Sequence, residues 1–191
     1  MDQATVGLNL ACGCEYRDDM INIDNKQMYG GNMIVDMEAD IFDLQWEPGA
    51  VHTILVNHFI QYVVPQKMYE LLQRWMTWLT PGGSIWIEAG NILAVAKNIL
   101  EAKTIGDLHG KDAIMQLYGI DDNIWNKWAW CPESLTPILQ QAGYVNIESH
   151  PGRFHQNPHR DFLMVAYKPN EYCNIQDICE GPSEKSATGQ P

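Results

Sequence analysis

Short apolar runs alternate with longer amphipathic stretches along most of the chain, and the two kinds of pattern predict different elements. Runs rich in Val, Ile and Leu are typical of strands, and they cover residues 5–10, 20–23, 33–36, 51–57, 84–89, 145–150 and 162–167. Apolar side chains recur at helical spacing in residues 65–79, 92–102 and 131–143. This alternation predicts an α/β domain with a mostly parallel sheet.

Proline and glycine mark the expected ends of these elements. Pro65 suits the first position of a helix, and residues 81–83 (PGG) end the same helix. Gly143 suits the left-handed position after the last helix, whereas Pro137 inside that helix predicts a kink or a late start near Thr136. Only residues 14–19 separate the first two strands, which is too few for a crossover helix, so a turn is expected there.

The composition narrows the class of protein. A chain of 191 residues with 46% hydrophobic and 19% charged side chains is typical of one soluble globular domain, expected over residues 1–169. Residues 170–191 are polar and aperiodic, which predicts a disordered tail. No apolar run has the length of a membrane helix, and no signal-peptide pattern opens the sequence, so neither spanning nor secretion is expected.

Charge and cysteine usage argue against two further classes. The net charge is −12, and residues 1–50 carry 10 acidic and only 2 basic side chains. A protein that clamps a nucleic-acid backbone needs a field of the opposite sign, so nucleic acid is not expected as a partner. The five cysteines are irregularly spaced and fit neither a disulfide framework nor a zinc ribbon, which predicts no metal site and a cytoplasmic location.

The first strand leads into the most informative stretch, residues 8–14 (LNLACGC), and the second strand ends at Asp24. A strand that breaks into a glycine turn lets backbone N–H groups approach a ligand closely. An acidic residue at the end of the next strand can accept both hydroxyls of a ribose. The pattern therefore predicts a nucleoside site, although the spacing is not the G-x-G-x-x-G that cradles a pyrophosphate.

Residues 8–13 (LNLACG) resemble the first motif, Leu-Asn-Leu-Gly-Cys-Gly, of small class I S-adenosylmethionine-dependent methyltransferases of the methyltransferase type 11 kind. Further matches follow in the family's order at residues 35–36, 39–41, 58–62, 79–83, 132–135 and 142–144. The resemblance covers about residues 5–168. It implies a Rossmann-like fold whose seven-stranded sheet is mostly parallel, with an antiparallel strand near the C-terminus and a truncated first crossover helix.

The resemblance also implies roles for individual residues. The methionine and ribose parts of S-adenosylmethionine are expected against Leu10, Ala11, Cys12, Gly13 and Cys14. Asp24 is expected to hold the ribose diol, Asp40 and Ile41 to flank the adenine, and Asn57 and His58 to lie beside the methionine portion. Ala11 replaces a glycine of the family, His52 an aspartate, and Gln61-Tyr62 a Glu-His pair. The last change weakens any assignment of a general base from the resemblance.

The acceptor is expected beyond the carboxyl ends of the strands, where open α/β sheets bind their ligands. The loop of residues 150–160 leaves one of these ends and carries three histidines and two arginines. Arg153 and Arg160 suit recognition of an anionic or sugar-like acceptor, and His155 or His159 is a candidate base. Trp128 lies with Trp125 and Trp130 in a segment predicted to cover the acceptor.

These features predict an enzyme that transfers a methyl group from S-adenosylmethionine to a small-molecule or saccharide acceptor and releases S-adenosylhomocysteine. A non-catalytic module or partner subunit that binds the same nucleosides is an alternative, and turnover with any acceptor would exclude it. A nicotinamide-dependent oxidoreductase is a second alternative, opposed by the missing pyrophosphate motif. The sequence does not define the acceptor, the atom methylated or the oligomeric state.

Overall fold

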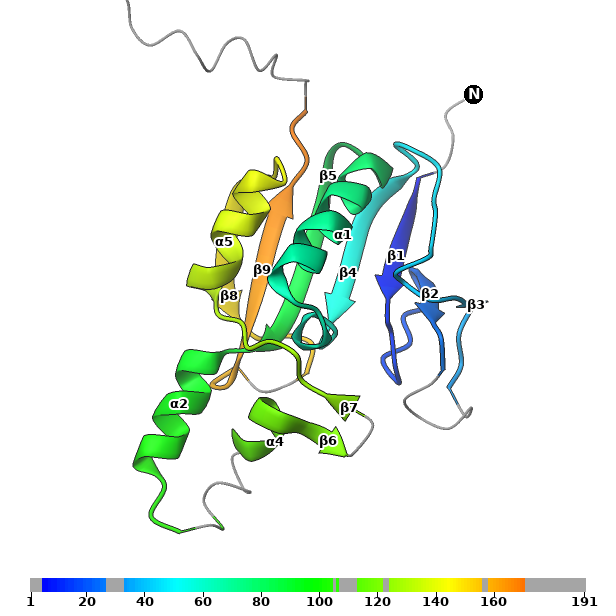
Figure 1. Cartoon of the computed structure of the whole chain (residues 1–191). Helices are drawn as coiled ribbons and strands as arrows, with labels where there is room; N and C mark the ends of the chain where they lie inside the picture. Colours follow the sequence, from blue (N-terminus) through cyan, green and yellow to red (C-terminus); the bar gives the residue numbers. More distant parts are fainter. Residues whose placement is uncertain are drawn as a thin grey trace, which may run out of the picture.

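A computed structural model describes residues 5–26, 33–104, 106, 113–121, 124–155 and 158–170. Its centre is a seven-stranded sheet in the order β3-β2-β1-β4-β5-β9-β8 (Figure 1). The strands are β1 (Val6–Leu10), β2 (Ile21–Asp24), β3 (Met37–Glu38), β4 (Val51–Asn57), β5 (Leu79–Gly90), β8 (Val145–Pro151) and β9 (Asp161–Tyr167). Strands β1 to β5 pair in parallel, and β9 is antiparallel to both of its neighbours. The predicted mostly parallel sheet with an antiparallel strand near its C-terminus is confirmed.

Two helices, α1 (Pro65–Trp78) and α5 (Pro132–Gln141), cover one face of the sheet (Figure 1). Helix α1 buries the stripe that its periodicity predicts, Met68, Leu71, Leu72, Trp75 and Trp78, in a core shared with the sheet. Helices α2 (Ile92–Glu101) and α4 (Ala113–Tyr118), together with the small hairpin β6 (Gly119–Asp121) and β7 (Ile124–Trp125), lie beyond the carboxyl ends of the parallel strands. A short 3₁₀ helix, η1 (Ile60–Tyr62), follows β4. No described helix has the length and apolar character needed to cross a membrane.

Two predicted boundaries are wrong. Residues 33–36 precede the third strand, because Asp36 is already bonded to Asn22 through its backbone and carboxylate, and only Met37–Glu38 pair with β2. Strand β5 begins at Leu79, which pairs with Val51 of β4, and not at residue 84, so residues 81–83 lie inside the strand and α1 ends before them, at Trp78.

Of the two starts expected for the last helix, α5 takes the earlier one, at Pro132, and not the late one near Thr136. Cys131 and Ser134 cap its first turn reciprocally, and the buried Leu135 fixes that turn in the core, so the helix tolerates Pro137.

The connection between β1 and β2 is a series of turns, as predicted from its length. Two buried asparagines at paired positions of the strands hold it. The Asn9 Nδ2 atom donates to the Glu15 carbonyl at 2.7 Å and to Asn22 Oδ1 at 2.9 Å. Asn22 Oδ1 accepts from the Arg17 N–H at 2.8 Å, and its Nδ2 donates to the Arg17 carbonyl at 2.9 Å. Side-chain amides therefore supply hydrogen bonds that hold this segment without a crossover helix.

The connection between β1 and β2 packs against the loop after β8, on the sheet face opposite α1 and α5. Trp86 lies on that face, because it alternates along β5 with the core residues Ile85 and Ile87. The Phe154 ring is 6.2 Å from the Trp86 ring, and the Arg17 guanidinium lies 4.5 Å from the Phe154 centroid. The loop after β8 is thus packed against the loop after β1. The predicted disordered tail lies, apart from Asn170, outside the described residues.

Candidate active site

A cavity of about 280 Å³ opens beyond the carboxyl ends of β1, β2 and β4. Five parts of the chain form its wall: the turn after β1, Asp24 at the end of β2, the end of β4 with the segment after it, the cover formed by α4, β6 and the residues after β7, and His155 in the loop after β8. The lining residues are Ala11, Cys12, Gly13, Cys14, Glu15, Asp24, Asn57, His58, Phe59, Gln61, Tyr62, Met115, Gln116, Gly119, Asn126 and His155. This is the end of the sheet at which open α/β folds bind ligands.

The turn after β1 has the backbone conformation of a glycine turn. Gly13 has φ +53°, and Ala11, which replaces a glycine of the resembling family, has φ +52°. The Gly13 N–H donates to Asp24 Oδ2 at 3.0 Å, which fixes that carboxylate at the cavity wall. Burial and the nearby Asp24 charge raise the pKa of the Cys12 thiol to about 11, so it stays neutral. The turn therefore presents backbone groups and one carboxylate.

The segment after β4 contributes unpaired acceptors. Asn57 Oδ1 and Gln61 Oε1 are buried and have no hydrogen-bonding partner among the residues that the structure describes. Both residues line the cavity. Buried acceptors without a donor are costly, so a ligand that brings N–H or O–H groups to them would gain binding energy.

The cover is tied to η1 by hydrogen bonds. The N–H groups of Lys127 and Trp128 both donate to the Gln61 carbonyl, at 2.8 and 3.1 Å. The indole N–H of the buried Trp130 donates to the Ile60 carbonyl at 2.8 Å. Trp128, predicted to contact the acceptor, is 45% exposed and lines a smaller recess that shares Gln61 and Gln116 with the main cavity. Its role in acceptor binding stays a prediction.

The described residues lining the cavity carry negative charge. Glu15 and Asp24 are acidic, and neither Lys nor Arg is among these lining residues. A low-dielectric hollow lined by one sign of charge favours ligands of the opposite sign. The cavity is therefore suited to a cationic ligand.

The structure brings most of the predicted nucleoside-site residues to this cavity, but not all of them. Leu10 and Ile41 are 0% and 4% exposed and pack in the core, outside the described cavity wall. Asp40 is exposed, and its carboxylate accepts a hydrogen bond from the Phe42 N–H at 2.8 Å. The roles of Asp40 and Ile41 beside an adenine stay predictions.

Of the residues predicted to bind or activate the acceptor in the loop of residues 150–160, only some reach the cavity. His155 reaches the cavity wall, whereas His159 and Arg153 are exposed and lie outside the described wall. The Arg153 guanidinium lies 5.8 Å from the Phe154 ring centroid. Arg160 was expected to bind an acceptor, but its side chain is only 4% exposed. Its guanidinium makes two hydrogen bonds to the Asp161 carboxylate instead.

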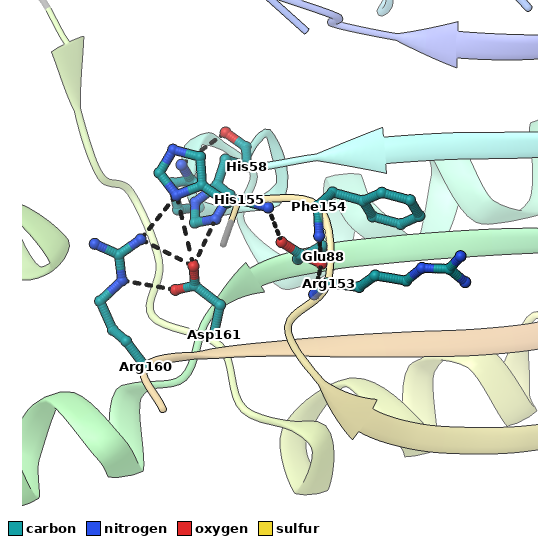
Figure 2. Close-up of polar contacts among 8 residues, drawn as sticks. His58, Glu88, Arg153, Phe154, His155, Arg160 and Asp161 are labelled. Carbon is teal, nitrogen blue, oxygen red and sulfur yellow. Dashed lines mark hydrogen bonds and ion pairs between the residues drawn. The ribbon is translucent and has the colours of Figure 1, made fainter. Parts of the chain in front are cut away.

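Asp161, which the sequence suggested only as a minor alternative, a metal ligand beside His155 and His159, is the buried centre of a polar network (Figure 2). Its Oδ1 accepts from Arg160 Nε at 2.7 Å, and its Oδ2 accepts from Arg160 Nη2 at 2.9 Å and from His58 Nε2 at 3.2 Å. Arg160 Nη2 also donates to His155 Nδ1 at 2.9 Å. Donor atoms of His58, His155 and Asp161 lie within 4.8 Å of one another, a spacing that a metal ion could use. Because Arg160 already bonds two of the three, we assign no metal to them.

Asp161 is expected to make unfolding pH-dependent in acid. Burial raises the pKa of its carboxyl group, but bonds from His58 and Arg160 outweigh this and lower the pKa from 3.8 to about 2. The ionised group therefore stabilises the fold above pH 3.8, and this contribution is lost as the pH falls towards 2. As the pH is lowered from about 6, the free energy of unfolding measured in urea is expected to fall less in Asp161→Asn than in wild type. In the control Asp43→Asn, which changes an exposed residue, this free energy should fall with pH as steeply as in wild type. An equally steep fall in all three proteins would contradict the network.

Glu88 is a residue that sequence reasoning missed. It is fully buried at 0% exposure near the end of β5, and its carboxylate accepts the backbone N–H groups of Arg153, Phe154 and His155 at 2.5 to 2.7 Å (Figure 2). Three charge-assisted bonds fix the loop that places His155 over the cavity. A lone acidic residue in the apolar run of residues 84–89 was the available sequence signal, because buried charges need partners.

The Glu88→Gln variant is expected to unfold at lower urea concentration, with a loss of about 2–3 kcal/mol, because an amide turns N–H donors toward backbone donors. Amide hydrogen exchange of residues 153–155 should accelerate in the same variant. The exposed Glu148→Gln change on β8 is the matched control and should alter neither measurement. Unchanged exchange in Glu88→Gln would show that the carboxylate does not hold the loop.

Comparison with solved structures identifies the fold. The chain matches an S-adenosylmethionine-dependent methyltransferase from Archaeoglobus fulgidus with a TM-score of 0.58 and 13% identity, over 86% of each chain. One from Mesorhizobium loti matches with a TM-score of 0.58 and 13% identity, over 87% of this chain and 93% of that one. A third match is phosphoethanolamine N-methyltransferase 2 of Haemonchus contortus, solved with phosphomonomethylethanolamine and S-adenosylhomocysteine. Its TM-score is 0.53 and its sequence identity 12%, over 88% of this chain.

This chain spans 50% of the length of the Haemonchus enzyme and 63% of the length of another neighbour, a possible exported protein of Bordetella parapertussis. No family model matches the sequence, and no curated protein does. The neighbours and the strand order, with its antiparallel β9, agree with each other. The chain therefore has the class I S-adenosylmethionine-dependent methyltransferase fold.

Proposed function

We propose that this chain binds S-adenosylmethionine in the cavity at the ends of β1, β2 and β4 and transfers its methyl group to a small-molecule or saccharide acceptor. The observation that carries the proposal is the pairing of a glycine-type turn and Asp24 with two unpaired buried acceptors, Asn57 Oδ1 and Gln61 Oε1. S-adenosylmethionine carries the groups that such a wall lacks: ribose hydroxyls, an ammonium group and a sulfonium charge.

Each part of the wall then has a task. The Asp24 carboxylate would accept hydrogen bonds from the ribose hydroxyls, and the bond from the Gly13 N–H holds it in position to do so. Asn57 and Gln61 would accept N–H groups of the ligand at the end of β4. The bound sulfonium supplies an activated methyl group, so the chain contributes mainly by positioning the acceptor and excluding water. The hydrogen bonds from Lys127 and Trp128 to Gln61 keep the cover over the cavity for this purpose.

The acidic wall and the size of the cavity favour a small acceptor over nucleic acid. The cavity measures about 280 Å³, and neither Lys nor Arg is among its described lining residues. A phosphate backbone would be repelled by Glu15, Asp24 and the net charge of −12. The compound bound beside S-adenosylhomocysteine in the Haemonchus neighbour, phosphomonomethylethanolamine, is itself a small molecule.

The test is an acceptor screen. The full chain would be incubated with S-adenosylmethionine and pools of sugars, phenols, amines and phosphoesters, and S-adenosylhomocysteine would be quantified by mass spectrometry. At least one pool is expected to raise its formation above the acceptor-free rate, and Asp24→Ala should reduce the increase when S-adenosylmethionine is kept near the wild-type dissociation constant. Tight nucleoside binding with no acceptor-dependent product from any pool would contradict the proposal and favour a non-catalytic binding module.

A further inference from the structure

We propose that His58, oriented by Asp161, is the catalytic base of this site, and that the acceptor therefore presents a hydroxyl group. This inference rests on the proposed function, since it assigns a role within the same cavity. It moves the base from the loop histidines His155 and His159 to the residue that directly follows β4.

Hydrogen-bond chemistry fixes which nitrogen of His58 is available. A carboxylate only accepts hydrogen bonds, so the 3.2 Å contact between His58 Nε2 and Asp161 Oδ2 requires the proton on Nε2. In the neutral ring, Nδ1 then carries the lone pair. Nδ1 makes no hydrogen bond with any residue that the structure describes, and His58 lines the cavity with 16% of its side chain exposed. The ring therefore has a free basic atom and an anchored opposite side.

His155 lacks a free basic nitrogen on the side of the ring that faces Arg160. A guanidinium only donates, so the 2.9 Å contact from Arg160 Nη2 occupies the lone pair of His155 Nδ1. The remaining nitrogen, Nε2, carries the proton of the neutral ring. The His155 ring instead packs on His58, with centroids 4.3 Å apart at an interplanar angle of 47°. His155 thus shields one side of the base, and the exposed His159 lies outside the described cavity wall.

The backbone at His58 is held in an unusual conformation. Its φ of +48° is in the left-handed region, which non-glycine residues rarely adopt. The His58 N–H donates to the Glu88 carbonyl at 2.9 Å, and Gln61 Nε2 donates to the His58 carbonyl at 2.7 Å. Strain held by surrounding bonds is common where a side chain must take a functional position. Here it directs the imidazole between Asp161 and the cavity.

A base of this kind specifies the acceptor. A neutral amine can attack a sulfonium methyl group with its own lone pair, whereas a hydroxyl is a weak nucleophile until its proton is removed. As the hydroxyl oxygen forms its bond to the methyl carbon, His58 Nδ1 takes the hydroxyl proton. The electron pair of the broken carbon–sulfur bond stays on the sulfur, which becomes neutral. The imidazolium is stabilised by the Asp161 carboxylate and then releases its proton to solvent, leaving a methyl ether and S-adenosylhomocysteine.

The test uses nitrogen-15 NMR of the full chain labelled at histidine, with His58→Asn to assign the His58 signals. The neutral His58 ring is expected to carry its proton on Nε2. Its titration is then followed with S-adenosylmethionine or S-adenosylhomocysteine bound, two probes that differ by the sulfonium charge. A positive charge in the cavity opposes imidazolium formation, so the midpoint should be lower by about 1 pH unit with S-adenosylmethionine.

The other charged or titratable groups around the ring are the same in both complexes, so the comparison isolates the sulfonium. Among the described residues they are Asp161, Arg160 and His155 on one side, and Cys12, Cys14, Glu15, Asp24 and Tyr62 in the cavity wall. His52, at the opposite end of β4, is the internal control and should titrate identically in both complexes.

Two results would overturn the assignment: a proton on Nδ1 of neutral His58, or equal His58 midpoints in the two complexes. Absence of binding of both nucleosides would instead overturn the proposed function. The tautomer of the unliganded ring is measured independently of binding, so the two failures are distinguishable.

Discussion

The His58→Asn variant is expected to transfer methyl groups to a hydroxyl acceptor at least 100-fold more slowly than wild type, because general-base catalysis typically contributes about 10²–10⁴-fold. Asparagine suits the position, since it tolerates the φ of +48° better than other side chains do. It is too short to replace the imidazole between Asp161 and the acceptor. The measurement is kcat with a hydroxyl compound found in the acceptor screen.

The matched control is His52→Asn, the same change on the same strand at an exposed position near its other end. Its kcat is expected to equal that of wild type. The S-adenosylhomocysteine dissociation constant is measured for both variants, and kcat is taken at saturating S-adenosylmethionine, which separates a lost base from a damaged cavity. A His58→Asn enzyme that keeps more than a third of the wild-type kcat would rule out His58 as the base.

Replacing Asp24 by alanine is expected to weaken S-adenosylhomocysteine binding by about 10–100-fold, because hydrogen bonds to a charged group contribute about 1.5–3 kcal/mol. Asp24 is the acidic residue that the glycine turn holds at the cavity wall, through the 3.0 Å bond from Gly13. Calorimetric titration of the variant and of wild type gives the two dissociation constants.

Asp19→Ala is the control for this change, since Asp19 is an exposed acidic residue of the same connection between β1 and β2. It removes the same charge from the surface and should leave the affinity unchanged. If Asp24→Ala binds as tightly as Asp19→Ala, the ribose does not lie against Asp24 and the orientation of the nucleoside must be revised.

Local patterns predicted most of the sheet because each strand carries its own signal. The apolar run of residues 51–57 became β4 with the same bounds, and Pro65 begins α1 as expected. The third strand was misplaced because its pairing depends on Asp36 docking to Asn22, a contact between residues 14 apart in sequence. Pro137 left two starts open for the last helix, and the capping and burial of the first turn of α5 favour the earlier one, at Pro132.

The site was predictable where chain neighbours define it and hidden where distant residues do. Asn57 ends β4 and His58 follows it directly, so both reach the cavity, and Asp24 reaches it because it ends β2. The bond from His58 to Asp161 spans 103 residues, and the bond from Arg153 to Glu88 spans 65. No spacing rule predicts such pairings. Arg160 was misinterpreted for the same reason, because only the folded chain shows that its fork is filled by its neighbour Asp161.

Calorimetric titration of the purified full chain with S-adenosylmethionine and S-adenosylhomocysteine tests the central claim most directly. The proposed cavity predicts one site per chain and a dissociation constant of about 1 μM to 1 mM, the range in which enzymes bind their substrates. Displacement of one nucleoside by the other would show that they share the site. A folded wild-type protein that releases or absorbs no binding heat with either ligand, and shows no thermal stabilisation by them, would contradict the account.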